Sequence, residues 1–588
     1  MILQELVRYY DRKALDPDPA QRLPSLGLEN KEIPFILEIA ADGGIIQLRD
    51  TRQLVGKKLR AQSFLVPQGE EKTSGIKANL LWDSAAYVIG LDTGRKNGAG
   101  PTPHEAYRER IAALPEPAKS DPGIRAVLAA LDRADWSLLQ SHPAWPEIVE
   151  TNPVLTFQLA GDLDLVCQRP VVVAAATQAD SDAADVLATC LVDGTPAPVQ
   201  RLHPSIKGVW GAQSSGADVV SFNARAFESY GKTERQGENA PVGTRAAFAY
   251  TTALNHLLDP ASRNRVQVGD ASTVFWADRV STFDSTFKLA DIFGESKDDP
   301  DRGVRAVKAL FDATRSGQLP VGERDARFFV LGLAPNAARI SIRFWLEAPL
   351  SDLAPRILRH FDDLRIVRRF DGDPQTPSLF RLLGSLALQA KLDNVPPRLA
   401  GEWMRAILEG QPYPATLLNA AVMRCRAEQD VSYLRAAVLK AWLNRDYRRT
   451  HPEAPPDTQH FKEELDMEQS DTPYRLGRLF AVLEHIQRQA MPGINATIRD
   501  RYYSAASTVP VTVFTTLLRL KNAHLKKLSD GQTGYFERLV GECLEPMNDF
   551  PRQLTLPQQA RFALGYYHQR QHFFTRKDAD NTTTGQEN

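Results

Sequence analysis

The segment PFILEIAADGGIIQL occupies residues 34–48 and has the pattern of two β-strands joined by a tight turn. Apolar residues recur from Pro34 to Ala40 with the spacing of a strand. The sequence Ala41-Asp42-Gly43-Gly44 then supplies the Asp and Gly residues that hairpin turns favour. A second strand is predicted from Ile45 to Leu48. The amino-terminal hundred residues are therefore predicted to be mainly β.

Similar patterns extend to both sides of this hairpin. A short helix is predicted from Ile2 to Tyr10 and another strand from Gln62 to Pro67. Prolines punctuate helix-forming sequence between residues 101 and 150, which indicates a helical insertion. Residues 153–175 are predicted to be rich in strands, with a hairpin turn at Gly161-Asp162. The first third of the chain is thus expected to mix sheet with an inserted helical segment.

Strands are expected to end near residue 346, and helices follow. Residues 328–333 and 338–346 alternate as two strands around a Pro335-Asn336 turn, whereas beyond Ala354 apolar residues recur at helical spacing. Five helices between residues 474 and 571 would form a bundle. The expected fold class is α+β, with a mixed, β-rich amino-terminal and middle region followed by an all-α region that ends in a small helical bundle.

This pattern divides the chain into four expected segments. They are a β-rich domain (1–100), an α+β middle region with a helical insertion and a Gly-rich loop (101–353), a helical region (354–459) and the carboxyl-terminal bundle (460–588).

Composition limits the partners and the compartment. Lys plus Arg (71) nearly balance Asp plus Glu (72), so any surface that binds phosphate groups must be local. Four isolated cysteines without clustered histidines are typical of reduced thiols and do not indicate a metal site. The longest apolar run, Val171 to Ala176, is too short to span a bilayer, and the amino terminus lacks the pattern of a signal peptide. We expect a cytoplasmic protein with no membrane partner.

Two segments invite a catalytic interpretation, and neither has the residues that the chemistry needs. Residues 208–216 read GVWGAQSSG, but no Lys follows Gly216 as a P-loop requires, and the G-x-S-x-G pattern is absent. Residues 360–363 read HFDD and could hold a divalent cation, yet neighbouring arginines make helix-surface ion pairs the simpler explanation. We expect no catalytic residue, no metal and no cofactor, and hence no enzyme.

Clusters of Lys and Arg indicate nucleic-acid binding more strongly than either of these segments indicates catalysis. The clusters are Lys57–Arg60, Lys72–Lys77, Arg356–Arg369, Arg435–Arg449 and Arg519–Lys527. Each could neutralise phosphate groups or simply form a solvated helix face, and both interpretations stay open. Within the fourth cluster, charge alternates with an aromatic ring at Arg445, Tyr447, Arg448 and Arg449. This arrangement suits a stacked single strand, although packing explains it equally well.

Several segments together carry a family resemblance. They are MILQELVRYY (1–10), KEIPF (31–35), FLVPQ (64–68), SGIKAN (74–79), LWD (81–83), SSGADVVSFN (214–223), FESYG (227–231) and VLGLAPNAARIS (330–341). In residues, order and spacing they closely resemble the Csd-type CRISPR-associated family. The resemblance spans the chain, and the last hundred residues are the least distinctive.

This resemblance implies the large subunit of a type I-C Cascade surveillance complex. Such a subunit engages duplex DNA beside the protospacer, checks the short adjacent motif and helps to open the strands. It lies near the crRNA 5′ handle, beside the backbone and crRNA-processing subunits, and supports recruitment of a separate helicase-nuclease. Base pairing with the RNA supplies sequence specificity, while the protein reads the adjacent motif and holds the strands.

Two loops are the candidates for contacts with nucleic acid. Reading a duplex needs hydrogen-bond donors on a loop that enters a groove, and Lys72, Thr73, Ser74, Lys77 and Asn79 supply them, with Gly75 allowing a close approach. The alternative is a plain loop with solvated lysines. The second candidate loop would contact DNA backbone, handle RNA or a neighbouring subunit through Lys207, Gln213, Ser214, Ser215 and Asn223.

The resemblance further implies a separate small subunit, translated from an internal start codon of the same gene. Met467 is well placed for this start, because it follows a polar linker (450–459) and would leave about 120 residues of helical bundle. That bundle would line the displaced DNA strand with Arg499, Arg501, Arg519, Lys521, Lys526 and Lys527. Two other hypotheses stay open for the whole chain: a metal-dependent nuclease and a purely structural scaffold.

Overall fold

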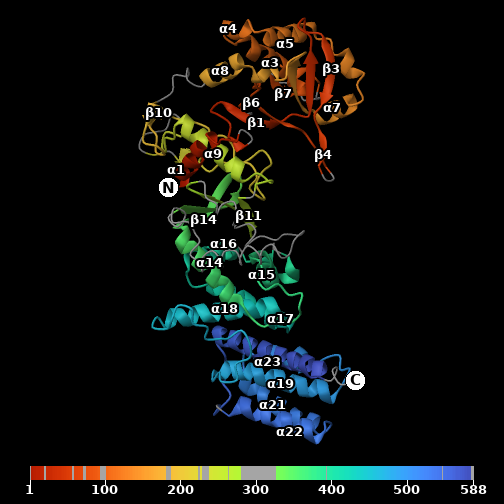
Figure 1. The fold of residues 1–588 in the computed structure, drawn as a ribbon, viewed down its shortest axis with the longest axis vertical. Coiled ribbons are helices and arrows are strands. Elements are labelled where there is room, and N and C mark those ends of the chain that lie inside the picture. The colour runs from red at the N-terminus through yellow and green to blue at the C-terminus, as the bar shows by residue number, and fades with distance from the viewer. Residues whose placement is uncertain are drawn as a thin grey trace. The chain divides into compact units, whose positions relative to one another are not determined.

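The structure is a computed structural model of the 588-residue chain (Figure 1). It describes residues 2–18, 21–55, 58–70, 75–92, 101–179, 187–222, 225–227, 229, 237–262, 264–279, 326–391, 394–396, 398–545 and 547–583. The chain forms two compact units. Unit 1 comprises Met1–Ser205 and Val220–His256, and unit 2 comprises Ile206–Val219 and Leu257–Asn588.

A four-stranded mixed sheet of order β3-β2-β8-β7 organises unit 1. Its central strand β2 (Phe35–Ile39) pairs antiparallel with β3 (Ile45–Asp50) and parallel with β8 (Val154–Leu159), and β7 (Trp82–Ser84) pairs antiparallel with β8. Strand β2 lies between two neighbouring strands, and helices pack against the sheet. Residues on both faces of β2 are therefore buried. The hairpin predicted over residues 34–48 is confirmed.

The helices of unit 1 pack around this sheet and an associated antiparallel pair, β1 and β6. Helix α5 (Pro122–Arg133) begins at the N-cap Asp121 and packs against β2 and β8. The remaining strands are β1 (Leu28–Glu32), β4 (Gln53–Val55), β5 (Lys58–Arg60), β6 (Ser63–Pro67), β9 (Leu187–Thr189) and β10 (Pro196–Pro198). The remaining helices are α1 (Ile2–Ala14), α2 (Ala85–Val88), α3 (Pro103–Ala112), α4 (Glu116–Lys119), α6 (Ser137–Gln140), α7 (Trp145–Thr151), α8 (Pro170–Ala179) and α9 (Thr244–Leu257), with 3₁₀ turns η2 (Val166–Gln168) and η3 (Arg225–Phe227).

One predicted strand region is wrong. Residues 163–175 were predicted to contain strands after a turn at Gly161-Asp162, but the chain forms η2 and then α8. Pro170 is pre-organised for the first position of a helix, and the following alanines are strong helix formers, so the three valines of this segment do not impose a strand.

Unit 2 begins with an antiparallel meander of order β11-β12-β13-β14. Strands β11 (Arg265–Val268) and β12 (Ala271–Ala277) pair with each other, and β12 also pairs with β13 (Arg327–Asn336). Strands β13 and β14 (Arg339–Pro349) form the predicted hairpin, but its turn is Ala337-Ala338, because Pro335 and Asn336 still pair with Ile340 and Arg339. Every residue of β12 is buried, since this strand lies inside the sheet.

Helices make up the rest of unit 2. They are α14 (Leu350–Leu364), α15 (Leu379–Leu386), α16 (Leu399–Glu409), α17 (Ala415–Glu428), α18 (Tyr433–Thr450), α19 (Thr472–Ala490), α20 (Ile498–Ala506), α21 (Pro510–Leu525), α22 (Asp530–Leu544) and α23 (Leu556–Thr583), with the 3₁₀ turn η4 (Leu388–Ala390). Capping boxes at Thr497 and Ser529 fix the starts of α20 and α22. The five predicted bundle helices are confirmed as α19 to α23.

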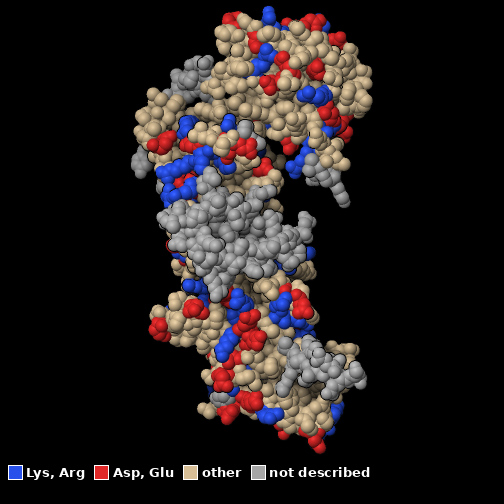
Figure 2. All heavy atoms as spheres, in the orientation of Figure 1, with Lys and Arg blue, Asp and Glu red and all other residues tan. Residues whose placement is uncertain are grey.

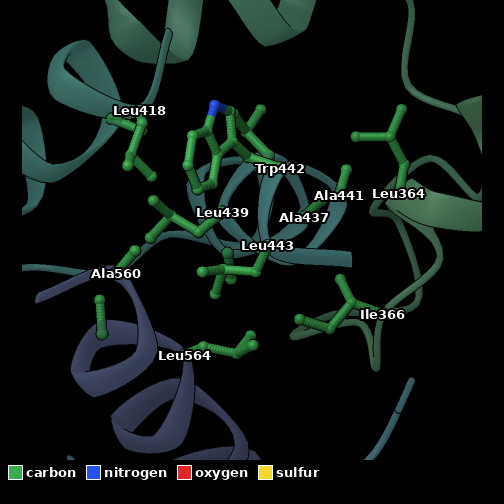
Figure 3. Close-up of a cluster of buried hydrophobic side chains, with 14 of the residues drawn as sticks. Leu364, Ile366, Leu418, Ala437, Leu439, Ala441, Trp442, Leu443, Ala560 and Leu564 are labelled. Atoms are coloured by element: carbon green, nitrogen blue, oxygen red, sulfur yellow. The ribbon is translucent and has the colours of Figure 1, made fainter. Parts of the chain in front are cut away.

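A continuous apolar core joins the bundle to the preceding helices. Figure 3 shows Leu439 and Leu443 of α18 close to Ala560 and Leu564 of α23, with Leu364 and Ile366 beyond the other side of α18. Helix α23 packs against both α17 and α18. The bundle is therefore part of a larger helical core within unit 2.

The predicted fold class, α+β with an all-α carboxyl-terminal region, is confirmed. The four expected segments differ from the two compact units, because β8, from the expected middle region, lies in the same sheet as β2. No helix in the described ranges is both long and apolar enough to cross a membrane.

Candidate nucleic-acid interface

The first candidate loop connects β6 to β7 and is anchored at both ends. Indole Nε1 of Trp82 donates to the carbonyl oxygen of Pro67 at 2.8 Å, and the buried Asp83 carboxylate accepts from the backbone N–H of Asn79 at 2.9 Å. The Asn79 side chain is also buried, and its Oδ1 accepts from the backbone N–H of Glu70 at 2.9 Å. Asn79 thus holds the two ends of the loop together.

The described part of the loop that faces solvent contains Gly75 and Lys77. Gly75 has φ +77°, and a Cβ built there meets no atom within 4 Å, so the backbone is open to a close approach. The Lys77 side chain is half exposed, and its ammonium lies 3.9 Å from a Glu70 oxygen. Lys72, Thr73 and Ser74 lie outside the described residues.

Glu70 connects this loop to the helical insertion. Its carboxylate accepts from Arg110 of α3 at 3.0 Å, a closer contact than the one with Lys77. Because Arg110 already neutralises Glu70, Lys77 can exchange this carboxylate for another anion at little electrostatic cost. Sequence reasoning missed Glu70 and Arg110, since forty residues separate them and neither belongs to a motif.

The second candidate loop belongs to unit 2 and is closed by backbone hydrogen bonds. Ile206 and Ala217 exchange two N–H···O bonds of 3.0 Å, and Asp218 is bonded to the β13–β14 hairpin through Ile340. The backbone N–H of Trp210 donates to Ser272 Oγ at 2.9 Å. The loop is therefore an ordered projection from the β-meander.

Polar side chains and one aromatic ring project from this second loop. Lys207, Gln213, Ser214 and Ser215 are exposed, while Asn223 lies outside the described residues. Trp210 is 54% exposed, although large aromatic side chains are usually buried. Sequence reasoning treated this tryptophan only as part of a glycine-rich string. Trp210 lies among glycine and polar residues in the sequence. This position was the signal that its ring could be exposed and could stack against a nucleic-acid base.

The six cationic residues of the bundle differ in how much they present to solvent. Arg499 is bonded to Asp430 and Asp500, and Lys521 lies 3.7 Å from Glu537 with 13% of its side chain exposed. The others are exposed: Arg501, Arg519, Lys526 and Lys527. Lys526 and Lys527 follow the last turn of α21, where a cation also stabilises the helix dipole.

The cluster at the end of α18 is used for packing. The guanidinium groups of Arg445 and Arg448 bind the fully buried Asp363 carboxylate at 3.0 and 2.7 Å. The Tyr447 ring lies between two histidine rings, His451 and His460, with centroid separations of 4.1 and 4.2 Å. Both faces of the ring are therefore occupied, and the structure favours packing over stacking on a single strand.

His360, Phe361 and Asp363 of the HFDD segment are buried, whereas Asp362 is partly exposed. His360 is fully buried and hydrogen-bonds Tyr413 at 2.5 Å, and burial together with the nearby Arg445 charge holds its pKa well below the usual range. Asp362 pairs with Arg365 at 3.1 Å. Among the described residues, no group of three or more His, Cys, Asp or Glu side chains is arranged to hold a metal ion.

Comparison with protein families identifies the chain's relatives. The family model described as CRISPR-associated protein (Cas_Csd1) matches residues 6–574. The chain belongs to this family. No curated protein matches the sequence.

The surface of this Cas_Csd1 protein carries charges of both signs. Figure 2 shows Lys and Arg interspersed with Asp and Glu, with a denser basic group over α1 and α9. Arg8 pairs with Glu5 and Arg245 with Asp11, yet more than half of each arginine side chain is exposed. Since these arginines lie far apart in the sequence, no local cluster pointed to them. They add a second basic area to unit 1 besides Lys77.

Proposed function

We propose that this Cas_Csd1 protein is the large subunit of a type I-C CRISPR surveillance complex and that it binds nucleic acid without cleaving it. The observation that carries the proposal is the family match over residues 6–574. The complex would contain crRNA together with backbone and crRNA-processing subunits. Specificity for the target would come from base pairing, and this subunit would recognise the adjacent motif in duplex DNA.

The β6–β7 loop is the proposed reader of the motif. It combines a backbone held at both ends by Asn79, Trp82 and Asp83 with an open glycine and a loosely paired lysine. These contacts restrain the two described ends of the loop, which lowers the entropic cost of binding there. In this proposal Lys77 contacts a base edge or a phosphate, with Lys72, Thr73 and Ser74 beside it, and Asn79 sets the shape of the loop.

The other candidate residues have supporting roles in this proposal. The projection around Trp210, with Lys207, Gln213, Ser214 and Ser215, would contact DNA backbone, handle RNA or a neighbouring subunit. Arg501, Arg519, Lys526 and Lys527 would hold the displaced strand and so stabilise the R-loop. Cleavage would belong to a helicase-nuclease that the assembled complex recruits, and a separate small subunit would begin at Met467.

The deciding experiment is DNA binding by the reconstituted crRNA complex with two target duplexes, one with the correct adjacent motif and one with a scrambled motif. Lys77→Ala should reduce discrimination between them by about tenfold, as loss of a base contact does. Lys119→Ala is the matched control, because Lys119 is another ion-paired lysine of unit 1. If Lys77→Ala assembles and discriminates as well as the parent, motif recognition lies elsewhere.

The same preparation tests the absence of nuclease activity. With Mg²⁺ or Mn²⁺ and no helicase-nuclease, labelled duplex should remain intact while binding falls steeply with salt. Cleavage that is lost in Asp362→Asn would favour a metal-dependent nuclease instead. Assembly with no DNA binding at any salt concentration would favour a scaffold.

A further inference from the structure

Helix α19 contains a buried arginine that has no acidic partner. Arg478 is 1% exposed, and none of its hydrogen bonds within the described part of the chain is to a carboxylate. Its Nε donates to Gln569 Oε1 at 3.2 Å, and its Nη2 lies 3.0 Å from the sulfur of Met467, whereas Nη1 has no partner there. A guanidinium keeps its charge at every physiological pH, so burying it without a counter-charge is strongly unfavourable.

The surroundings of this guanidinium come from one helix–helix contact. Side chains of a helix lean toward its amino terminus, so Arg478 extends back toward the first turn of α19. In that turn, the hydroxyl of Tyr474 is hydrogen-bonded to Nδ1 of His568 on α23 at 2.8 Å. Gln569, which accepts from Arg478, is the next residue of α23. Two residues of α19 therefore face two consecutive residues of α23 in a polar cluster within the apolar core.

The atoms of this cluster that lack a partner are hydrogen-bond donors. Gln569 and His568 are 0% and 1% exposed. Since Oε1 of Gln569 accepts from Arg478, its unpartnered atom is the amide Nε2. The hydroxyl oxygen of Tyr474 accepts from the backbone N–H of Asp466, so its hydrogen points to Nδ1 of His568 and the ring hydrogen lies on the unpartnered Nε2. All three side chains thus have N–H groups that no acceptor uses.

The acidic residues nearest in the chain are already paired with other cations. The Asp466 carboxylate binds Lys462 at 3.0 Å, and that of Asp471 binds Arg561 at 2.8 Å. Asp471 also caps α19, whose amino terminus adds partial positive charge to the same region. The interior around Arg478 therefore has unused donors and an excess of positive charge.

A small anion satisfies these groups better than water does. A buried water molecule needs acceptors for its own two hydrogens, and a cluster of donors offers none. Water also leaves the charge of the guanidinium uncompensated. A monovalent anion accepts several N–H bonds and neutralises the charge, whereas a divalent anion would replace one uncompensated charge by another.

We propose that Arg478 binds one small monovalent anion of the chloride class at Nη1, with the N–H groups of Gln569 and His568 as further donors. Met467 is 44% exposed and contacts the guanidinium, so a movement of its side chain opens the site to solvent. The anion is a structural part of the contact between α19 and α23. Its binding does not depend on the proposed function, although a small subunit that began at Met467 would contain the whole site.

Thermal unfolding of the full-length chain tests the proposal. Sodium chloride is compared with sodium gluconate at equal concentrations, from about 1 to about 300 mM, because gluconate screens charges equally and is too large for an enclosed site. The Tm should rise with chloride by at least about 2 °C more than with gluconate, since a ligand of the folded state stabilises it by mass action. The same Tm in both salts at every concentration would overturn the proposal.

Two arginine substitutions on the same helix locate the effect. Arg478→Met should abolish the difference between the salts without lowering the Tm in gluconate, because an apolar side chain of similar volume tolerates burial better than an unpaired charge. Arg475→Met is the control, since Arg475 donates to the carbonyl oxygens of Gln469 and Glu542 at 2.6 and 2.8 Å. It should lower the Tm in both salts and keep the chloride effect. A chloride effect that survives Arg478→Met would overturn the assignment.

Diffraction from crystals of the full-length chain grown in bromide identifies the occupant. An anomalous peak beside Nη1 of Arg478 is expected. Density without an anomalous signal would mean water and would overturn the proposal. A bromide peak with no chloride effect on the Tm would mean an adventitious ion only, which also overturns it. Neither measurement uses DNA or crRNA, so failure here is distinguishable from failure of motif recognition.

Discussion

Asp363 illustrates how one residue determines the packing of several elements. Its fully buried carboxylate, on α14, accepts hydrogen bonds from Arg445 and Arg448 of α18 and from Gln459 of the segment that follows. Arg448 also donates to the carbonyl oxygen of Thr458 at 2.9 Å. The expected polar linker at residues 450–459 is thereby fixed to the helical core, because one interior charge requires several partners.

Replacing this carboxylate should destabilise unit 2 strongly. Asp363→Asn leaves two guanidinium groups without their counter-charge in the interior and should lower the free energy of unfolding by about 3–5 kcal/mol. Asp362→Asn, which breaks a partly exposed pair with Arg365, should cost less than about 1 kcal/mol. Urea denaturation followed by circular dichroism compares the two variants. Equal losses would contradict the role assigned to Asp363.

Buried histidines should make stability depend on pH. Burial lowers the pKa of His203 to about 4 and that of His568 to about 3, where each ring hydrogen-bonds a tyrosine hydroxyl. Above about pH 6.5 these rings are neutral in both folded and unfolded chains. Below it, the unfolded chain binds protons that the folded chain does not, so stability should fall by up to about 1.4 kcal/mol per pH unit for each histidine.

Thermal unfolding between pH 7 and pH 4.5 measures this dependence. His568→Asn should have a shallower slope than the parent, because it removes one group that titrates only in the unfolded chain. Carboxylates titrate in both proteins, so their contribution to the dependence of stability on pH cancels when the two slopes are compared. Identical slopes would show that His568 is protonated in the folded protein.

At the scale of elements, two glycines allow α19 and α23 to lie in contact. A Cβ built at Gly477 would be 1.9 Å from the carbonyl oxygen of Phe562, and one built at Gly565 would be 2.0 Å from that of Tyr474. Backbone atoms cannot move aside as side-chain ends can. Gly477→Ala should therefore separate the helices and lower the free energy of unfolding by about 1–3 kcal/mol or more.

A matched glycine substitution should change the free energy of unfolding in the opposite direction. Gly541 lies within α22, and a Cβ built there meets no atom within 4 Å. Gly541→Ala should raise the free energy of unfolding by about 0.5–1 kcal/mol, because alanine loses less backbone entropy in a helix. Chemical denaturation of both variants tests the helix contact. A neutral Gly477→Ala would mean that α19 and α23 lie further apart.

The elements that sequence predicts well are those with local signals. The hairpin at residues 34–48 and the five bundle helices are confirmed because period, turn and cap residues lie within each element. Helix α8 was mistaken for strand because its β-branched valines outweighed Pro170 and the alanines. Candidate-site geometry depends on distant pairs instead. Glu70 and Arg110, for example, meet only after folding, and no spacing in the sequence predicts their contact.

At the scale of the whole molecule, the bundle cannot be regarded as an appended domain. Besides the core between α18 and α23, the hydroxyl of Tyr567 donates to the carbonyl oxygen of Val367 at 2.7 Å, and Arg570 bonds Asp430 at 3.2 Å. A small subunit that began at Met467 would therefore carry an apolar face on α23 that α17 and α18 cover in the full chain. This apolar face predicts that a piece beginning at Met467 binds to the rest of the chain.

Two separately expressed pieces, residues 1–466 and 467–588, should associate without a covalent link. The reason is that burial of apolar side chains such as Leu564 and Leu443 stabilises the junction by about 1.5–3 kcal/mol for each large residue. Co-purification through a tag on the first piece, followed by size-exclusion chromatography, measures the association.

Leu564→Glu in the second piece should abolish the association, since a carboxylate would lie within the apolar contact. Val511→Glu, at an exposed position of α21, should leave it intact. Association that survives Leu564→Glu would place the contact on another face of the bundle, whereas a helical second piece that never binds the first would show that the junction is too weak to hold without the covalent chain.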